Sequence, residues 1–144
     1  MNYIDVALDE AKKSKDIDEV PVGAVIVYKD NIIAKGHNIS NNDTVSNHAE
    51  IIAINEAIRI INDWRLNECE MYVTLEPCPM CAGAILKSRI KKVYIGTTSN
   101  IKSNKKIIES IFNNNDYYHN VDYEYLNNDN CSKILTDFFK EKRL

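Results

Sequence analysis

Apolar positions recur along this chain with two different periods, and the period changes from one segment to the next. In residues 2–14 the apolar residues Ile4, Ala7, Leu8 and Ala11 follow the spacing of one face of a helix. Two runs rich in β-branched residues, 22–28 and 32–36, flank the short polar stretch 29–31. This arrangement predicts an amphipathic helix followed by a β-hairpin.

The rest of the chain alternates between the two patterns. We predict helices at 48–61, from residue 78 to about 88, near 105–112 and at the C-terminus, and strands at 71–75, 92–95 and 121–125. The C-terminal helix would bury the stripe Cys131, Ile134, Leu135, Phe138 and Phe139. Alternation of strands with helices predicts an α/β fold with helices on both faces of one sheet, and the hairpin makes that sheet mixed. No repeat or linker interrupts the pattern, so we expect residues 1–144 to form a single domain.

Composition narrows the class of protein. The 144 residues are 44% hydrophobic and 27% charged, typical of a soluble globular chain. No apolar run is as long as a membrane span, and the first residues lack the features of a signal peptide. We therefore expect a protein of the cytosol or an organelle matrix. The net charge is −3, but the basic residues cluster at 87–92, 102–106 and 140–143, which favours a nucleic-acid partner unless each cluster is only a solvated face.

Four residues form a candidate metal site. Cys78 and Cys81 are separated by two residues and flanked by Pro77 and Pro79, which favour the start of a helix. His48 and Glu50 would lie in the first turn of another helix, capped by Ser46 or Asn47. His48, Cys78 and Cys81 give three zinc ligands, whereas a structural zinc site has four protein ligands and a catalytic site leaves one position for water.

Glu50 favours the catalytic alternative, because a carboxylate beside an open metal position can handle a proton. The pattern His-x-Glu followed by Pro-Cys-x-x-Cys is that of zinc nucleobase deaminases. Two other interpretations of the cysteines are a redox pair and half of a structural zinc knuckle. The remaining cysteines, Cys69 and Cys131, are expected to be reduced and buried. We also expect Gly83 to permit close helix–sheet packing, and the glycines at 23, 36 and 96 to leave room for a turn or a ligand.

Several strings in this sequence resemble the TadA-type tRNA adenosine deaminases of the cytidine-deaminase-like superfamily. They are Pro21-Val22-Gly23-Ala24-Val25, Gly36-His37-Asn38, His48-Ala49-Glu50-Ile51, Leu75-Glu76-Pro77-Cys78, Met80-Cys81-Ala82-Gly83-Ala84-Ile85, Ser88-Arg89-Ile90 and Asp137-Phe138-Phe139. The resemblance runs from about residue 3 to the C-terminus. It implies a three-layer α/β/α fold with a central five-stranded mixed sheet.

The resemblance also implies a function. It predicts hydrolytic conversion of adenosine to inosine at the wobble position of a tRNA anticodon, by a homodimer with one Zn²⁺ per subunit. The anticodon arm would be the partner, and no membrane is involved. His48, Cys78 and Cys81 would be ligands and Glu50 the proton shuttle. Asn38 would hydrogen-bond the purine, Val22 would line the pocket, and Ala49 would contribute backbone contacts to the base.

The segment 97–104 departs from the family pattern, which has an acidic residue, a lysine and a glycine-rich turn where this chain has Thr-Thr-Ser-Asn-Ile-Lys-Ser-Asn. In the family this segment holds nucleotides beside the target base, so the chemistry is better defined than the substrate. Two alternatives stay open. One is a deaminase of a free base or nucleoside, such as cytosine or guanine, on the same fold. The other is a non-catalytic, zinc-stabilised RNA-binding module.

Overall fold

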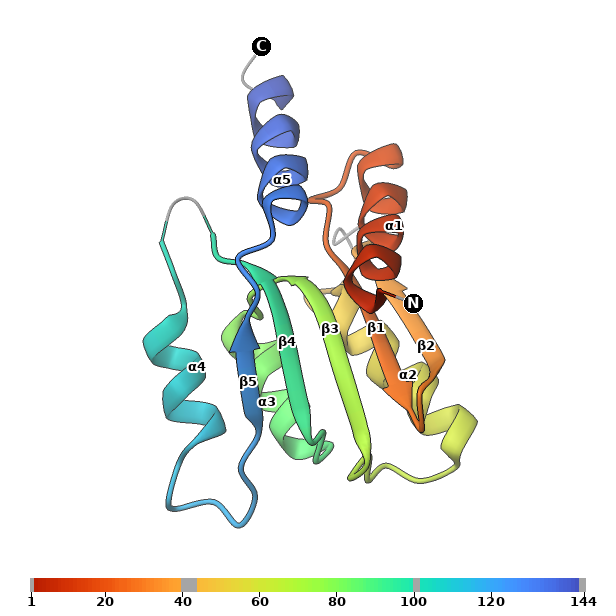
Figure 1. Cartoon of the computed structure of the whole chain (residues 1–144), viewed down its shortest axis with the longest axis vertical. Coiled ribbons are helices and arrows are strands. Elements are labelled where there is room, and N and C mark those ends of the chain that lie inside the picture. The colour runs from red at the N-terminus through yellow and green to blue at the C-terminus, as the bar shows by residue number, and fades with distance from the viewer. Residues whose placement is uncertain (1, 40–43, 100–101, 143–144) are drawn as a thin grey trace.

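A mixed β-sheet forms the middle layer of the computed structural model, which describes residues 2–39, 44–99 and 102–142 (Figure 1). Its five strands run in the order β2-β1-β3-β4-β5. β1 (Gly23–Tyr28) pairs antiparallel with β2 (Asn31–His37) and with β3 (Cys69–Leu75), and β4 (Lys92–Thr97) and β5 (Asp122–Tyr125) continue the sheet in parallel. The predicted mixed sheet is confirmed.

Helices cover both faces of this sheet, as Figure 1 shows. α2 (Ala49–Ile61), α3 (Pro79–Lys87) and α4 (Lys105–Phe112) pack on one face, and α1 (Tyr3–Asp16) and α5 (Asp129–Lys142) pack on the other. Successive side chains of β1 point to opposite faces of the sheet, so this strand contributes to the cores on both faces. Ala24 and Ile26 contribute to the core under α2 and α3, while Val25 contributes to the core under α1. This is the three-layer α/β/α fold expected from the sequence.

The hairpin between β1 and β2 is tighter than predicted. Tyr28 pairs with Asn31, so only Lys29 and Asp30 lie in the turn. Both have positive φ values, 48° and 64°, as a type I′ turn requires. Asn31 therefore begins the second strand instead of ending the turn.

Glycines permit close contact between the helices and the sheet, but not where the sequence suggested. A Cβ atom at Gly23 would collide with the carbonyl oxygen of Ala7 in α1, and one at Gly36 with that of Ala49 in α2. At Gly96 a Cβ would lie 2.5 Å from the sulfur of Cys131. At Gly83 it would meet nothing within 4 Å. The packing role predicted for Gly83 is wrong, and the other three glycines have that role.

The two cysteines outside the metal site agree with the sequence-based expectation. Cys69 and Cys131 are free and buried, as predicted. Within the described ranges of the chain, no helix combines the length and the apolar content that crossing a membrane would require.

Candidate active site

Two helix N-termini meet at one end of the sheet and carry the predicted metal ligands. His48 is the N-cap residue of α2 and Cys78 is the N-cap residue of α3, with Pro79 at the first helical position. The predicted cap from Ser46 or Asn47 is wrong. Instead, the side chain of Asn38 accepts a hydrogen bond from the backbone N–H of Ala49 at 2.9 Å. Asn38 therefore caps the N-terminus of α2 from outside the helix, because this N–H has no partner within the helix.

The three predicted ligands are brought together in space. Their ligand atoms all lie within 4.8 Å of one another. His48 Nδ1 lies 3.6 Å from Cys78 Sγ and 3.4 Å from Cys81 Sγ. Zn–S bonds of about 2.3 Å and Zn–N bonds of about 2.0 Å at tetrahedral angles place a nitrogen and a sulfur ligand about 3.5 Å apart. The side chains therefore fit a tetrahedral zinc site with three protein ligands.

The environment of the thiols supports the same conclusion. A hydrogen bond from the Cys81 thiol and backbone N–H groups at the start of α3 lower the pKa of Cys78 to about 5, although burial opposes this shift. The pKa of Cys81 is raised, first because its thiol proton is held by Cys78 and then because the side chain is buried. One sulfur is thus already a thiolate at neutral pH, and a bound cation would replace the proton shared by the two.

Glu50 lies against these ligands in the first turn of α2. The side chain is buried, with 4% of the residue exposed, and burial raises its pKa to about 7. Cys78, His48 and Cys81 all influence this pKa. Glu50 can therefore hold and release a proton near neutral pH beside the candidate metal ligands.

The three predicted substrate contacts form a connected path next to the ligands. The backbone N–H of Asn38 donates to the carbonyl of Val22 at 3.2 Å, and the side chain of Asn38 reaches Ala49. Ser14 of α1 donates from its hydroxyl to the carbonyl of Asn38 at 2.7 Å. Because the Oδ1 atom of Asn38 accepts from Ala49, the Nδ2 amide is the group that can face a ligand. The N–H of Ala49 is engaged by Asn38, so a contact of Ala49 with a base would need another backbone atom.

Two buried carboxylates near the site were not singled out from the sequence. Glu10 of α1 accepts a hydrogen bond from Lys13 at 2.6 Å and lies 3.3 Å from Nδ1 of His37. Burial would raise the pKa of Glu10, but these two partners outweigh it and hold the pKa below its usual value. Glu76, at the end of β3, has 3% of its surface exposed. In the sequence, Glu10 lies within the predicted amphipathic helix at 2–14, and Glu76 directly precedes the Pro-Cys-x-x-Cys motif.

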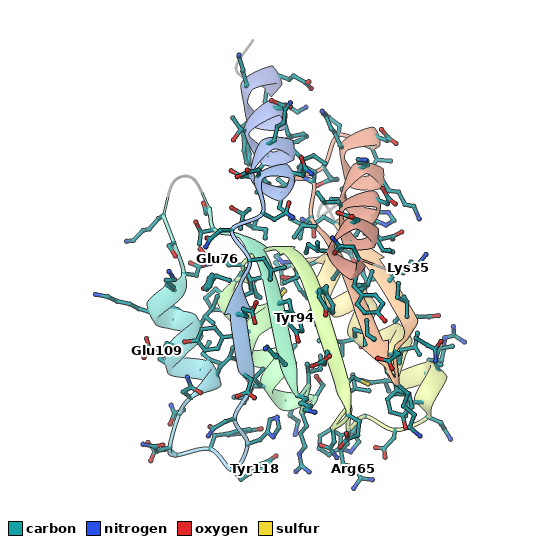
Figure 2. The ribbon with its side chains drawn as sticks, viewed as in Figure 1. Lys35, Arg65, Glu76, Tyr94, Glu109 and Tyr118 are labelled. Atoms are coloured by element: carbon teal, nitrogen blue, oxygen red, sulfur yellow. The ribbon has the colours of Figure 1, made fainter. Side chains whose placement is uncertain are left out.

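The basic clusters lie in different parts of the molecule. Arg89 stacks over Trp64 and Tyr118, and Figure 2 shows Tyr118 and Arg65 at the end of the sheet opposite Glu76. Lys142 in α5 forms an ion pair with Asp18, and Arg143 lies outside the described residues. Lys102 precedes α4, and Lys105 and Lys106 begin it, next to Ser103 and Asn104, which hydrogen-bond Glu76. This cluster is the one beside the metal ligands.

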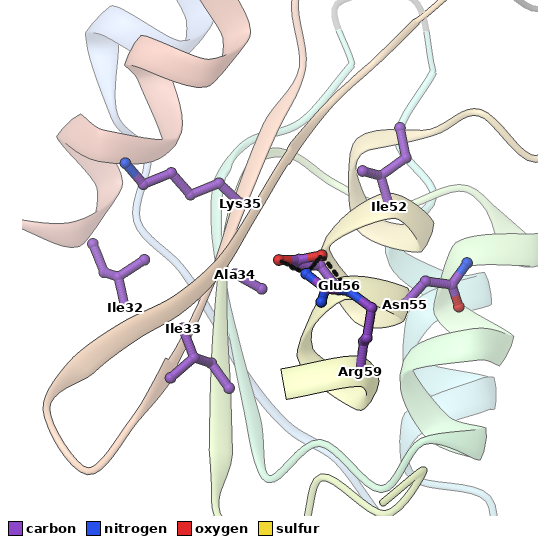
Figure 3. A pocket seen from close by; sticks show the side chains of 8 residues that line it. All are labelled: Ile32, Ile33, Ala34, Lys35, Ile52, Asn55, Glu56 and Arg59. Carbon is purple, nitrogen blue, oxygen red and sulfur yellow. Dashed lines mark hydrogen bonds and ion pairs between the residues drawn. The ribbon is translucent and has the colours of Figure 1, made fainter. Parts of the chain in front are cut away.

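A groove of about 660 Å³ between β2 and α2 differs from the metal site in its chemistry (Figure 3). Apolar side chains and one ion pair line most of it. Glu56 and Arg59 pair with each other at 2.7 Å, and neither His48 nor a cysteine lines the groove. The groove offers no donor set for a metal or for proton transfer.

Comparison with known proteins agrees with this site. Residues 1–97 match the family of the cytidine and deoxycytidylate deaminase zinc-binding region. The matched range contains His48, Glu50, Cys78 and Cys81, so the chain belongs to this class of zinc-binding deaminases.

Relatives with similarity along almost the whole chain define the family more closely. The tRNA-specific adenosine deaminase of Buchnera aphidicola subsp. Schizaphis graminum is 40% identical over 143 residues, 98% of this chain and 94% of the relative. A structure solved in a study of A-to-I editing by tRNA:A34 deaminases superposes with a TM-score of 0.84 at 34% identity, covering 92% of this chain and 98% of that chain. The protein is a member of the tRNA-specific adenosine deaminase family. A guanine deaminase from Nitrosomonas europaea, with a TM-score of 0.78 at 18% identity over 94% of this chain and 81% of its own, shares the fold.

Proposed function

We propose that this protein deaminates adenosine to inosine at the wobble position of a tRNA anticodon. The observation that carries the proposal is the His48, Cys78 and Cys81 cluster with the buried carboxyl group of Glu50 against it. The close relatives that share almost the whole chain are tRNA-specific adenosine deaminases.

His48, Cys78 and Cys81 would hold one Zn²⁺ per chain. When bound, the metal supplies Lewis-acid chemistry that makes a water molecule more acidic. The two helix N-termini favour negative charge at the sulfur ligands, because their N–H groups point toward the site. Two thiolates and a neutral imidazole would cancel the charge of the cation, which leaves water activation dependent on a nearby base.

Glu50 would supply that base and then return the proton. Hydrolysis adds water across the C6–N1 double bond of the purine and then breaks the bond from C6 to the amino group, so one proton of the water must move to N1 and the other to the departing amino group, which leaves as ammonia. A carboxyl group with a pKa of about 7 is matched to both transfers near neutral pH. Asn38 Nδ2 would donate to the purine, and Val22 would form an apolar wall beside it.

The proposal also includes the RNA partner of the protein and its oligomeric state. We infer that the anticodon arm approaches the end of the sheet that carries the metal ligands, and that two copies of the single 1–144 domain form a homodimer. A tRNA substrate favours the cytoplasm or an organelle matrix. The lysine cluster at 102–106 provides positive charge beside the site, as contacts with RNA phosphates require.

One alternative deserves a direct comparison, because a guanine deaminase shares the fold. The purified protein would be assayed with an anticodon stem-loop that carries adenosine at the wobble position, with free guanine and with cytosine. We expect inosine in the RNA and no turnover of the free bases. Turnover of a free base without inosine formation would assign the protein to the alternative.

Glu50→Gln tests the catalytic role against a purely structural zinc module. We expect this variant to keep zinc and its fold, and to lose activity by roughly 10²- to 10⁴-fold, as for loss of a general acid–base group. Glu56→Gln is the matched control, because Glu56 lies on the same helix and pairs with Arg59 away from the site. Wild-type turnover in Glu50→Gln would contradict the assigned role.

A further inference from the structure

Glu76 is a buried carboxylate that gathers four hydrogen-bond donors from other segments of the chain. Its Oε1 atom accepts from the backbone N–H of Asn104 at 2.7 Å and from that of Ser99 at 3.5 Å. Its Oε2 atom accepts from the Tyr125 hydroxyl at 3.0 Å and from the Ser103 hydroxyl at 3.2 Å. These donors come from both described sides of segment 97–104 and from the end of β5.

This arrangement uses both carboxylate oxygens of Glu76 as hydrogen-bond acceptors. An ionised carboxyl group is an acceptor at both oxygens, and four donors occupy the lone pairs that it offers. Within the described ranges Glu76 forms no ion pair with a lysine or an arginine. Hydrogen bonds and the N-terminus of α4, whose N-cap residue is Asn104, therefore compensate its charge.

Further bonds attach the same segment to the turn that carries the metal ligands. The N–H of Glu76 donates to the carbonyl of Thr97 at 2.9 Å, and the side-chain amide of Asn104 donates to the carbonyl of Pro77 at 3.2 Å. Pro77 immediately precedes Cys78. The ends of segment 97–104 are thus fixed to the two residues before the first cysteine ligand.

We propose that Glu76 is a positioning residue that holds the described residues 97–99 and 102–104 and the start of α4 beside the metal site, where they contact the RNA next to the target base. This inference rests on the proposed function. A base bound at the ligands must enter with its flanking phosphates close by, and Lys102 of this segment and Lys105 at the start of α4 lie beside the turn. Phosphate contacts of this kind orient a nucleic acid and carry binding energy without taking part in the chemistry.

The proposal separates binding from catalysis. Glu76 does not contact the reacting atoms, so its loss should raise KM for RNA and leave kcat nearly unchanged. Glu76→Ala removes all four acceptor contacts. Glu76→Gln keeps an oxygen for the two backbone donors, and its amide can donate to the two hydroxyls, which rotate to accept. We therefore expect the Gln variant to restore most of what the Ala variant loses.

Steady-state deamination of the anticodon stem-loop tests this directly. For Glu76→Ala we expect KM to rise about tenfold, kcat to stay within about threefold, and the zinc content to match that of wild type; tenfold corresponds to about 1.4 kcal/mol. Glu70→Ala, at the other end of β3, is the matched control and should behave as wild type. A parallel fall of kcat and zinc content in Glu76→Ala, or an unchanged KM, would overturn the proposal.

Limited trypsin digestion gives a readout that does not depend on activity. Release of the segment should speed cleavage after Lys102 by about tenfold, while cleavage after Lys29 in the hairpin turn serves as the internal reference. Equal acceleration at both positions would indicate general destabilisation and would refute the anchoring role. Wild-type protein that lacks RNA deamination refutes the proposed function instead, so the two failures are distinguishable.

Discussion

Asn38 offers the sharpest test of the site, because its two side-chain atoms have different predicted roles. Oδ1 accepts the backbone N–H of Ala49 at the start of α2, the helix that carries His48 and Glu50. Nδ2 is the group proposed to donate to the purine. Asn38→Asp keeps the acceptor and removes the donor, whereas Asn38→Ala removes both. The pair of variants therefore separates a structural cap from a substrate contact.

The magnitudes follow from the contacts. Loss of a side-chain cap at a helix start costs about 1 kcal/mol of stability, so Asn38→Ala should lower the free energy of unfolding by that amount. In Asn38→Asp the cap bond persists and a negative charge near the helix N-terminus is favourable, so stability should stay within about 1 kcal/mol of wild type. An unpaired acceptor on a buried base costs about 1–3 kcal/mol, which predicts a loss of roughly 5- to 150-fold in kcat/KM for both variants.

Urea denaturation of the zinc-loaded proteins and kcat/KM on the anticodon stem-loop measure the two quantities. Asn55→Asp is the control, since Asn55 is exposed on α2 and lines the groove in Figure 3. A stable Asn38→Asp variant with wild-type kcat/KM would show that Nδ2 does not contact the base. Equal loss of stability in both Asn38 variants would refute the capping role of Oδ1.

Two further predictions concern the cysteines and the glycines. In metal-free protein at pH 7, Cys78 should react with iodoacetamide before the other cysteines. The rate of this reaction should rise with pH, with a midpoint near the Cys78 pKa of about 5. Zinc should suppress this reaction, and Cys69, whose pKa is raised by burial to about 11, should react only on unfolding; labelling of Cys69 before Cys78 would contradict the site. Gly36→Ala should destabilise the protein by about 1–3 kcal/mol because its Cβ meets the backbone of α2. Gly83→Ala should stabilise it by about 0.5–1 kcal/mol in thermal unfolding, because this helical position has open space; destabilisation at Gly83 would show that the space is used.

Local signals explain why the sequence alone predicted the three side chains that the structure brings together as a candidate metal site. Proline at the first position of α3 and a helix start after His48 are encoded within a few residues, so the ligand positions at the two N-termini followed from short strings. The same holds for the helix and strand positions, where α1 is predicted at 2–14 and found at Tyr3–Asp16. Each of these predictions uses information from one contiguous stretch.

The predictions that failed depended on contacts between distant segments. The cap of α2 comes from Asn38 and not from the adjacent Ser46 or Asn47. Gly83 lies next to the cysteine ligands, yet the close helix–sheet contacts are made at Gly36 and Gly23, against helices from other parts of the chain. A local string does not specify which helix lies over a given glycine, so tertiary packing decided these cases.

Glu76 shows how a matching motif can coexist with a segment that departs from the family. Two of its four donors, those of Ser99 and Asn104, are backbone N–H groups, which almost any residue provides. Among the described residues of segment 97–104, the anchor uses the side chains of Ser103 and Asn104, so the other described positions can change while the ends of the segment stay attached beside Cys78. Variation there should alter the contacts with flanking nucleotides without moving the ligands.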